Sequence, residues 1–122
     1  MVGNTFTLLV LRAKNPEHLA KEWAAFGMDF SRESHGDGPT HFVCNVGDLI
    51  FEIYPLADEQ SPTTSVRVGL RVDDLASLLM ELPQGMTLVK TPQDIEGGAT
   101  AIVRDSEGHT IELTQDKQRF TG

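Results

Sequence analysis

The apolar residues in the first half of the chain change their spacing twice. A run rich in Leu and Val, Phe6 to Ala13, predicts a β-strand. The Asn-Pro-Glu sequence at residues 15–17 predicts the start of a helix, because Asn caps helices and proline fits the first helical position. Gly27 can end this helix in a left-handed conformation. Apolar residues at helical spacing lie between these two signals: Leu19, Trp23 and Phe26.

Three short runs follow, and each of them predicts a strand. A loop rich in Gly and Asp, residues 34–39, separates the first two runs. Gly47-Asp48 separates the second from the third and is typical of a two-residue β-hairpin turn. The three predicted strands are Met28–Glu33, His41–Val46 and Leu49–Pro55.

The order of elements then starts again after a polar segment, residues 57–65, which we interpret as a linker. Val66–Val72 predicts a strand, and Asp73 or Asp74 can cap the helix that follows it. One face of that helix is apolar, formed by Leu75, Leu78, Leu79 and Leu82. Three further strands are predicted at Met86–Lys90, Ala99–Arg104 and Thr110–Gln115.

The two halves of the sequence align with each other. LRAKNPEHL, which starts at Leu11, matches LRVDDLASL, which starts at Leu70, 59 positions later. FEI around Glu52 also matches IEL around Glu112, at an offset of 60 positions. Each half alone would leave one face of its sheet uncovered, so the two are expected to pack together around a concave cleft. The sequence therefore predicts an α+β fold of two tandem βαβββ modules with curved mixed sheets.

Length and charge limit the possible partners. The 122 residues suit one domain, which we divide into module 1 (about 5–56), the linker (57–65), module 2 (about 66–115) and a tail (116–122). A net charge of −8 with scattered basic residues disfavours nucleic acids and anionic membranes. The absence of a long apolar run or a signal sequence favours a cytoplasmic protein. The single cysteine, Cys44, excludes an internal disulfide and is expected to be buried among apolar neighbours.

Three segments resemble a known family. The strand-into-helix junction of the vicinal-oxygen-chelate superfamily is similar to GLRVDDLASLL in this chain. Its closing hairpin is similar to RDSEGHTIEL, and the end of its first helix is similar to WAAFG. This superfamily includes glyoxalase I, ring-cleaving dioxygenases and bleomycin-resistance proteins. The resemblance covers about nine-tenths of the chain and implies the glyoxalase/bleomycin-resistance fold and a homodimer. It says less about activity, because this fold carries many different chemistries.

Metal enzymes of this superfamily take one ligand from the first and last strands of each module, commonly His and Glu. The resemblance and the repeat together place Glu52 and Glu112 at the two Glu positions, and Leu8 and Arg67 at the two positions that are often His. A leucine side chain offers no lone pair, and a guanidinium offers only donors and a positive charge. Two carboxylates are too few ligands for a metal site. The usual metal site is therefore expected to be missing.

Strand alternation places several of these residues in the expected cleft. If Gly47-Asp48 is the hairpin turn, Val43 pairs with Glu52 and His41 with Tyr54, so that His41, Glu52 and Tyr54 line one patch. Arg67 and Arg71 share a face of their strand. We hypothesise that Arg67 neutralises Glu52 or Glu112 as a metal cation would, and it can equally be a structural ion-pair partner.

The remaining candidates have simpler interpretations. His109 follows a glycine turn and is expected to be solvated, as are His18 and His35. Trp23 is expected to lie in the core. Tyr54 can either stack on an aromatic ligand or pack against a neighbouring strand.

These observations favour a metal-independent protein that binds or sequesters a small organic molecule in a cleft lined by six residues: Leu8, His41, Glu52, Tyr54, Arg67 and Glu112. The net charge favours a cationic ligand, whereas Arg67 and Arg71 near the expected cleft favour an anionic one. The two arginines count for more, because salt screens the distant surface charges. The alternative is a glyoxalase-like lyase or isomerase in which Glu52, Glu112 and His41 recruit a divalent metal. No other cofactor is expected. A third possibility is an interaction module whose cleft has closed.

Overall fold

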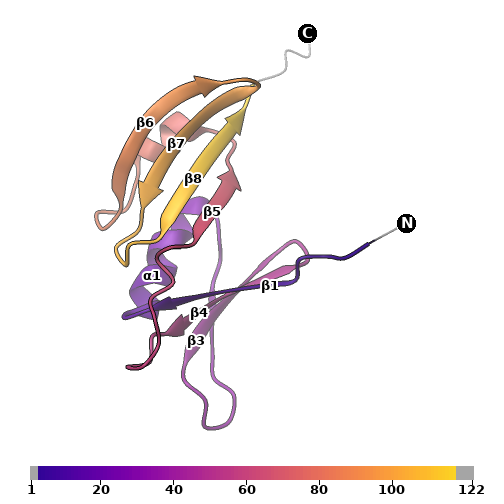
Figure 1. Cartoon of the computed structure of the whole chain (residues 1–122), viewed down its shortest axis with the longest axis vertical. Helices are drawn as coiled ribbons and strands as arrows, with labels where there is room; N and C mark the ends of the chain where they lie inside the picture. The colour runs from indigo at the N-terminus through magenta and orange to yellow at the C-terminus, as the bar shows by residue number, and fades with distance from the viewer. Residues whose placement is uncertain (1–2, 118–122) are drawn as a thin grey trace. The chain divides into compact units, whose positions relative to one another are not determined.

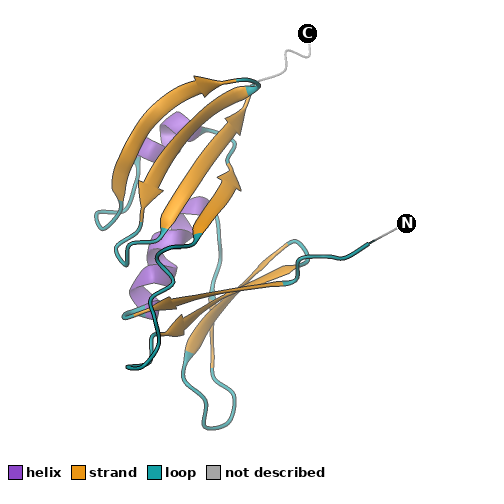
Figure 2. Ribbon diagram, viewed as in Figure 1, coloured by secondary structure: helices purple, strands orange, loops and turns teal. Residues whose placement is uncertain are grey.

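The computed structural model describes residues 3–117, which divide between residues 63 and 64 into two compact units. Each unit places a helix on one side of its own four-stranded sheet (Figures 1 and 2). No helix among these residues has the length and apolar character that crossing a membrane requires.

The first unit follows the order strand, helix, then three strands. Its sheet has the order β1-β4-β3-β2, in which β1 runs parallel to β4 and the other neighbours are antiparallel. The core lies between this sheet and the helix, where Trp23 meets Phe51 edge to face at a centroid distance of 4.9 Å. The expectation that Trp23 lies in the core is therefore confirmed, and Cys44 is buried as expected. The elements are β1 (Leu8–Ala13), α1 (Pro16–Trp23), the 3-10 turn η1 (Ala24–Phe26), β2 (Ser31–Glu33), β3 (His41–Val46) and β4 (Leu49–Pro55).

The second unit repeats this connectivity. Its sheet has the order β5-β8-β7-β6, and β5 runs parallel to β8. The prediction of two tandem βαβββ modules in an α+β fold is confirmed. The internal repeat also holds at the level of strand register, because Val10 pairs with Glu52 and Gly69, its repeat equivalent, pairs with Glu112. The elements are β5 (Arg67–Arg71), α2 (Leu75–Met80), β6 (Thr87–Ile95), β7 (Gly98–Arg104) and β8 (Thr110–Asp116).

The helix signals act as predicted. The Asn15 side chain accepts the backbone N–H of His18 at 3.1 Å, and Pro16 is the first residue of α1. Asp74 caps α2 by accepting from the backbone N–H of Ser77 at 3.0 Å. Hydrogen bonds from that N–H and from the Ser77 hydroxyl lower the pKa of Asp74 below its usual value. Gly27 adopts φ 82° after the 3-10 turn that continues α1.

Several predicted bounds were wrong, including those of two strands and of the tail. The strand expected at residues 28–33 is reduced to Ser31–Glu33. The strand expected at 86–90 extends to Ile95, because β6 is an edge strand whose register shifts near Pro92, and edge strands tolerate proline. The tail expected from residue 116 begins inside β8, and residues 118–122 lie outside the described part of the chain.

Candidate functional site

The sheet of the first unit presents one face that α1 does not cover. Along β4, Phe51 and Ile53 are buried on the helix side, so the alternating Glu52 and Tyr54 lie on the opposite, open face. Leu8 lies on this open face too, where it pairs with Ile50 and is exposed. The open face therefore brings together four of the six residues predicted to bind a ligand: Leu8, His41, Glu52 and Tyr54.

Polar atoms of three of these residues converge on the open face. The rings of His41 and Tyr54 stack at a centroid distance of 4.1 Å with an interplanar angle of 7°. The Tyr54 hydroxyl lies 3.4 Å from Nε2 of His41, and the Glu52 carboxylate lies 3.6 Å from the same nitrogen. The hairpin register explains this arrangement, since Val43 pairs with Glu52 as the Gly47-Asp48 turn predicted.

Burial fixes this imidazole while leaving the carboxylate accessible. His41 is only 1% exposed, whereas the Glu52 side chain is 19% exposed. Nδ1 of His41 lies 3.1 Å from the carbonyl oxygen of Pro39, which can only accept, so Nδ1 carries a hydrogen. In the neutral imidazole, Nε2 then has the free lone pair and accepts from the Tyr54 hydroxyl.

Tyr54 is held on both faces of its ring. The Arg12 guanidinium carbon lies 5.1 Å from the ring centroid, and His41 covers the ring as well. Because β1 and β3 flank β4 on opposite sides, these two neighbours cover opposite ring faces. Packing against neighbouring strands is therefore the interpretation of Tyr54 that the structure favours, and its hydroxyl remains the group that can contact a ligand.

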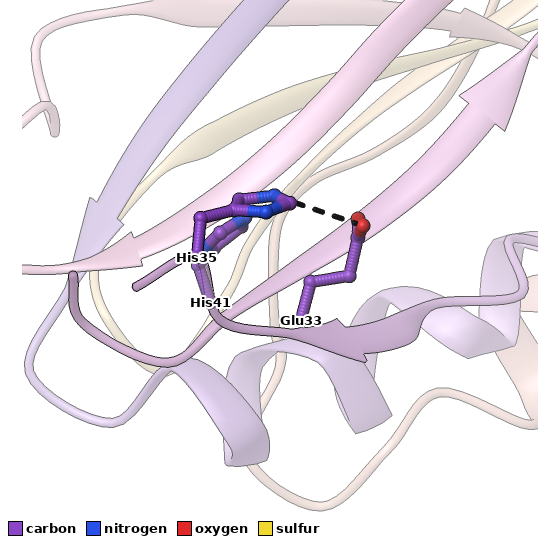
Figure 3. A group of neighbouring side chains, drawn as sticks. All are labelled: Glu33, His35 and His41. Carbon is purple, nitrogen blue, oxygen red and sulfur yellow. Dashed lines mark ion pairs between the residues drawn. The ribbon is translucent and has the colours of Figure 1, made fainter. Parts of the chain in front are cut away.

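Two further side chains join His41 at the edge of the sheet (Figure 3). Glu33 ends β2, opposite His41 in the strand register, and His35 follows on the loop to β3. One nitrogen or carboxylate oxygen from each of these three residues lies within 4.8 Å of the other two. Nε2 of His35 lies 3.8 Å from Oε1 of Glu33, and the His35 side chain is 74% exposed, as predicted. The grouping was not predicted from the sequence, although the pairing of residues 33 and 41 across the hairpin was a signal for it.

The second unit holds the other two predicted cleft residues on the open face of its own sheet. Arg67 lies 3.5 Å from the Glu112 carboxylate, and their side chains are 63% and 41% exposed. Arg71 lies 3.1 Å from the carboxylate of Asp116. Of the two partners hypothesised for Arg67, the structure shows a contact with Glu112. Both arginines that favoured an anionic ligand therefore have carboxylate partners.

His109 is the sequence prediction that fails most clearly. It is fully buried rather than solvated, and its Nδ1 lies 3.0 Å from Oδ2 of Asp105. Oδ1 of Asp105 also accepts the backbone N–H groups of Glu107, Gly108 and His109 at 3.0, 3.0 and 2.9 Å. The turn thus folds around one buried carboxylate and carries His109 inward. The spacing Asp-x-x-Gly-His was the sequence signal for this turn.

No protein-family model and no curated protein matches the sequence. Solved structures do match. TnmS3, an antibiotic-binding protein from Streptomyces sp. CB03234, superimposes with a TM-score of 0.69 and 20% identity over 96% of this chain and 99% of its own. A bleomycin resistance determinant encoded on the transposon Tn5 superimposes with a TM-score of 0.61 and 18% identity over 94% of this chain and 100% of its own. A glyoxalase-related enzyme from Fulvimarina pelagi superimposes with a TM-score of 0.71 and 16% identity over 92% of this chain and 88% of its own. The chain has the vicinal-oxygen-chelate fold.

The usual metal positions of this fold can be tested against the donor groups of the chain. Leu8 lies on the open face beside Ile50 and offers no lone pair. Arg67 occupies the equivalent position of the second sheet and contacts Glu112, the residue that would otherwise be a ligand. A cation at the usual position would therefore compete with the guanidinium for Glu112. The residues present do not fit the usual metal site of the vicinal-oxygen-chelate fold.

Proposed function

We propose that the protein binds a small organic molecule on the open face of the first sheet, with Glu52 and the Tyr54 hydroxyl as its polar contacts and the buried His41 holding them in place. The convergence of a phenol, an imidazole and a carboxylate within 3.4–3.6 Å on that face carries the proposal. Binding pockets combine apolar surface with a few convergent polar groups, and Val10 and Val43 flank Glu52 on the neighbouring strands. Antibiotic-binding and bleomycin-resistance proteins of the same fold support a role in sequestration.

The charges favour a neutral or cationic ligand that carries hydrogen-bond donors. Arg67 and Arg71, the two arginines that would favour an anionic ligand, each contact a carboxylate of their own sheet. Glu52 is partly exposed and offers an acceptor to a ligand. The net charge of −8 acts in the same direction.

We further propose that binding needs no metal, because Leu8 and Arg67 replace two of the usual ligands. The alternative is a metal-dependent lyase or isomerase that uses Glu52, Glu112 and His41. The contact of 3.6 Å between Glu52 and His41 favours it, and the contact between Arg67 and Glu112 opposes it. Homodimer formation and a ligand site between the two modules stay predictions.

A thermal-shift screen tests the proposal. Purified protein in EDTA would be screened against a panel of antibiotics that includes bleomycin, and each hit would be titrated by calorimetry against wild type, Glu52→Gln and Glu59→Gln. Glu59 is the matched control, because it is an exposed carboxylate in the loop after β4. We expect a hit whose affinity falls at least about tenfold in Glu52→Gln, since losing a charged hydrogen bond costs about 1.5–3 kcal/mol. A panel without hits, or hits insensitive to Glu52→Gln, would contradict the proposal.

A further inference from the structure

We infer that Glu33, His35 and His41 form a binding site for a divalent transition-metal ion at the edge of the first sheet. The site goes beyond the proposed function, because its ligand is the metal alone. It is also distinct from the usual metal positions of the fold, which correspond here to Leu8, Glu52, Arg67 and Glu112. One donor atom from each of the three residues lies within 4.8 Å of the other two (Figure 3).

The donor types define the class of ion. Two imidazoles and one carboxylate are ligands that Zn²⁺ accepts, and imidazole also suits Ni²⁺ and Cu²⁺. Mg²⁺ and Ca²⁺ prefer oxygen ligands, so a site with two nitrogen ligands selects against them. The three side chains come from the end of β2, the following loop and the start of β3, so every donor belongs to the first unit.

His41 is already prepared for this role. Its Nδ1 is bonded to the Pro39 carbonyl oxygen at 3.1 Å, so Nε2 carries the lone pair, and a metal ion would take the place of the Tyr54 hydroxyl that lies 3.4 Å from this nitrogen. Metal-binding histidines commonly donate their second ring nitrogen to a backbone carbonyl in this way, and the bond fixes both the tautomer and the ring orientation. Burial holds the ring further, as His41 is 1% exposed.

The remaining adjustment falls on His35, the exposed member of the group. Ligand atoms that lie about 2.0–2.1 Å from one tetrahedral ion lie about 3.3 Å from each other, so the group has to contract. Glu33 and His41 are held opposite each other by the pairing of β2 and β3. His35 is 74% exposed on the loop, next to Gly36 with φ 56°, so it can approach without losing buried contacts.

Calorimetric titration with metal tests the site. Tag-free protein freed of metal with EDTA and then of chelator would be titrated with ZnCl₂, for wild type, Glu33→Gln, His35→Gln and the control His18→Gln. His18 suits as a control, because it is a half-exposed histidine of α1 with its own carboxylate partner, Glu22. We expect one saturable site in wild type and in His18→Gln. We expect affinity at least about tenfold weaker in Glu33→Gln and His35→Gln, because even outer-shell partners of a metal contribute about 10–100-fold.

Two further measurements keep the test decisive. Circular dichroism of each variant without metal should match that of wild type, since Glu33 and His35 are not core residues. A hundredfold excess of Mg²⁺ should leave the Zn²⁺ titration unchanged. Wild type without saturable binding, or His35→Gln and Glu33→Gln that bind as tightly as wild type, would overturn the inference. Loss of binding in Glu112→Gln with retention in His35→Gln would also overturn it, because the ion would then occupy the usual position of the fold.

Discussion

Replacing Asp105 by alanine should destabilise the protein more than replacing any exposed charged residue would. The side chain is fully buried with that of His109, which it meets at 3.0 Å, and one of its oxygens accepts three backbone N–H groups of the turn. Alanine removes these contacts together and takes the carboxylate away from a buried imidazole. It also removes the acceptor from three backbone N–H groups, of which that of His109 is buried.

The magnitude follows from these contacts. Removing the acceptor of a buried hydrogen-bond donor costs about 1–3 kcal/mol for each donor left unsatisfied. A hydrogen bond to a charged group contributes about 1.5–3 kcal/mol, and the contributions of neighbouring bonds overlap and are not additive. We therefore expect Asp105→Ala to lower the free energy of unfolding by about 3 kcal/mol. Asp105→Asn keeps an acceptor oxygen and should lose about half as much.

Urea denaturation measures this loss. Far-UV circular dichroism follows both sheets, whereas the fluorescence of the single tryptophan, Trp23, follows the first unit. The control is Asp58→Ala, an exposed loop carboxylate whose removal should change stability by under about 0.5 kcal/mol. Asp105→Ala with a stability within about 1 kcal/mol of wild type would refute the reasoning, because a buried carboxylate with four contacts would then contribute no more than a surface group.

Three other predictions concern the second unit. Gly98→Ala should destabilise by at least about 2 kcal/mol in urea melts, since a Cβ there would lie 1.9 Å from the backbone oxygen of Gln115, whereas Gly69→Ala, with open space around it, should be neutral. The lowered pKa of Asp74 means that its carboxylate stabilises the fold above its unfolded pKa. The difference in melting temperature between wild type and Asp74→Ala should therefore be full at pH 7 and vanish as the pH falls through the folded pKa. Arg67→Ala should cost under about 1 kcal/mol by thermal melts, because the pair with its carboxylate partner is exposed, and a larger loss would indicate a buried role.

The repeat and the turn made much of the fold predictable from sequence. Two matching halves imply two modules of the same connectivity, and both sheets have that connectivity. The two-residue turn Gly47-Asp48 fixes the register of β3 and β4, because a hairpin turn sets the pairing of every residue behind it. The meeting of His41, Glu52 and Tyr54 on one face followed from that register alone.

Residues placed by loops were not predictable in the same way. His109 is buried because the backbone amides of the turn before it donate to the Asp105 carboxylate and fold the turn around it. The spacing of apolar side chains does not predict such hydrogen bonds. His35 is exposed as predicted, yet its closeness to His41 depends on the path of a seven-residue loop between β2 and β3. The contact of Arg67 with Glu112 instead of Glu52 depends on which residues share a sheet.

The most direct test of ligand binding on the open face of the first sheet is an NMR titration of ¹⁵N-labelled protein, in EDTA, with hits from the antibiotic panel. The account predicts that amide signals of β3 and β4, around His41, Val43, Glu52 and Tyr54, shift saturably, and that Glu52→Gln weakens the response. Saturable shifts confined to other elements, or no saturable shifts with any compound, would contradict it.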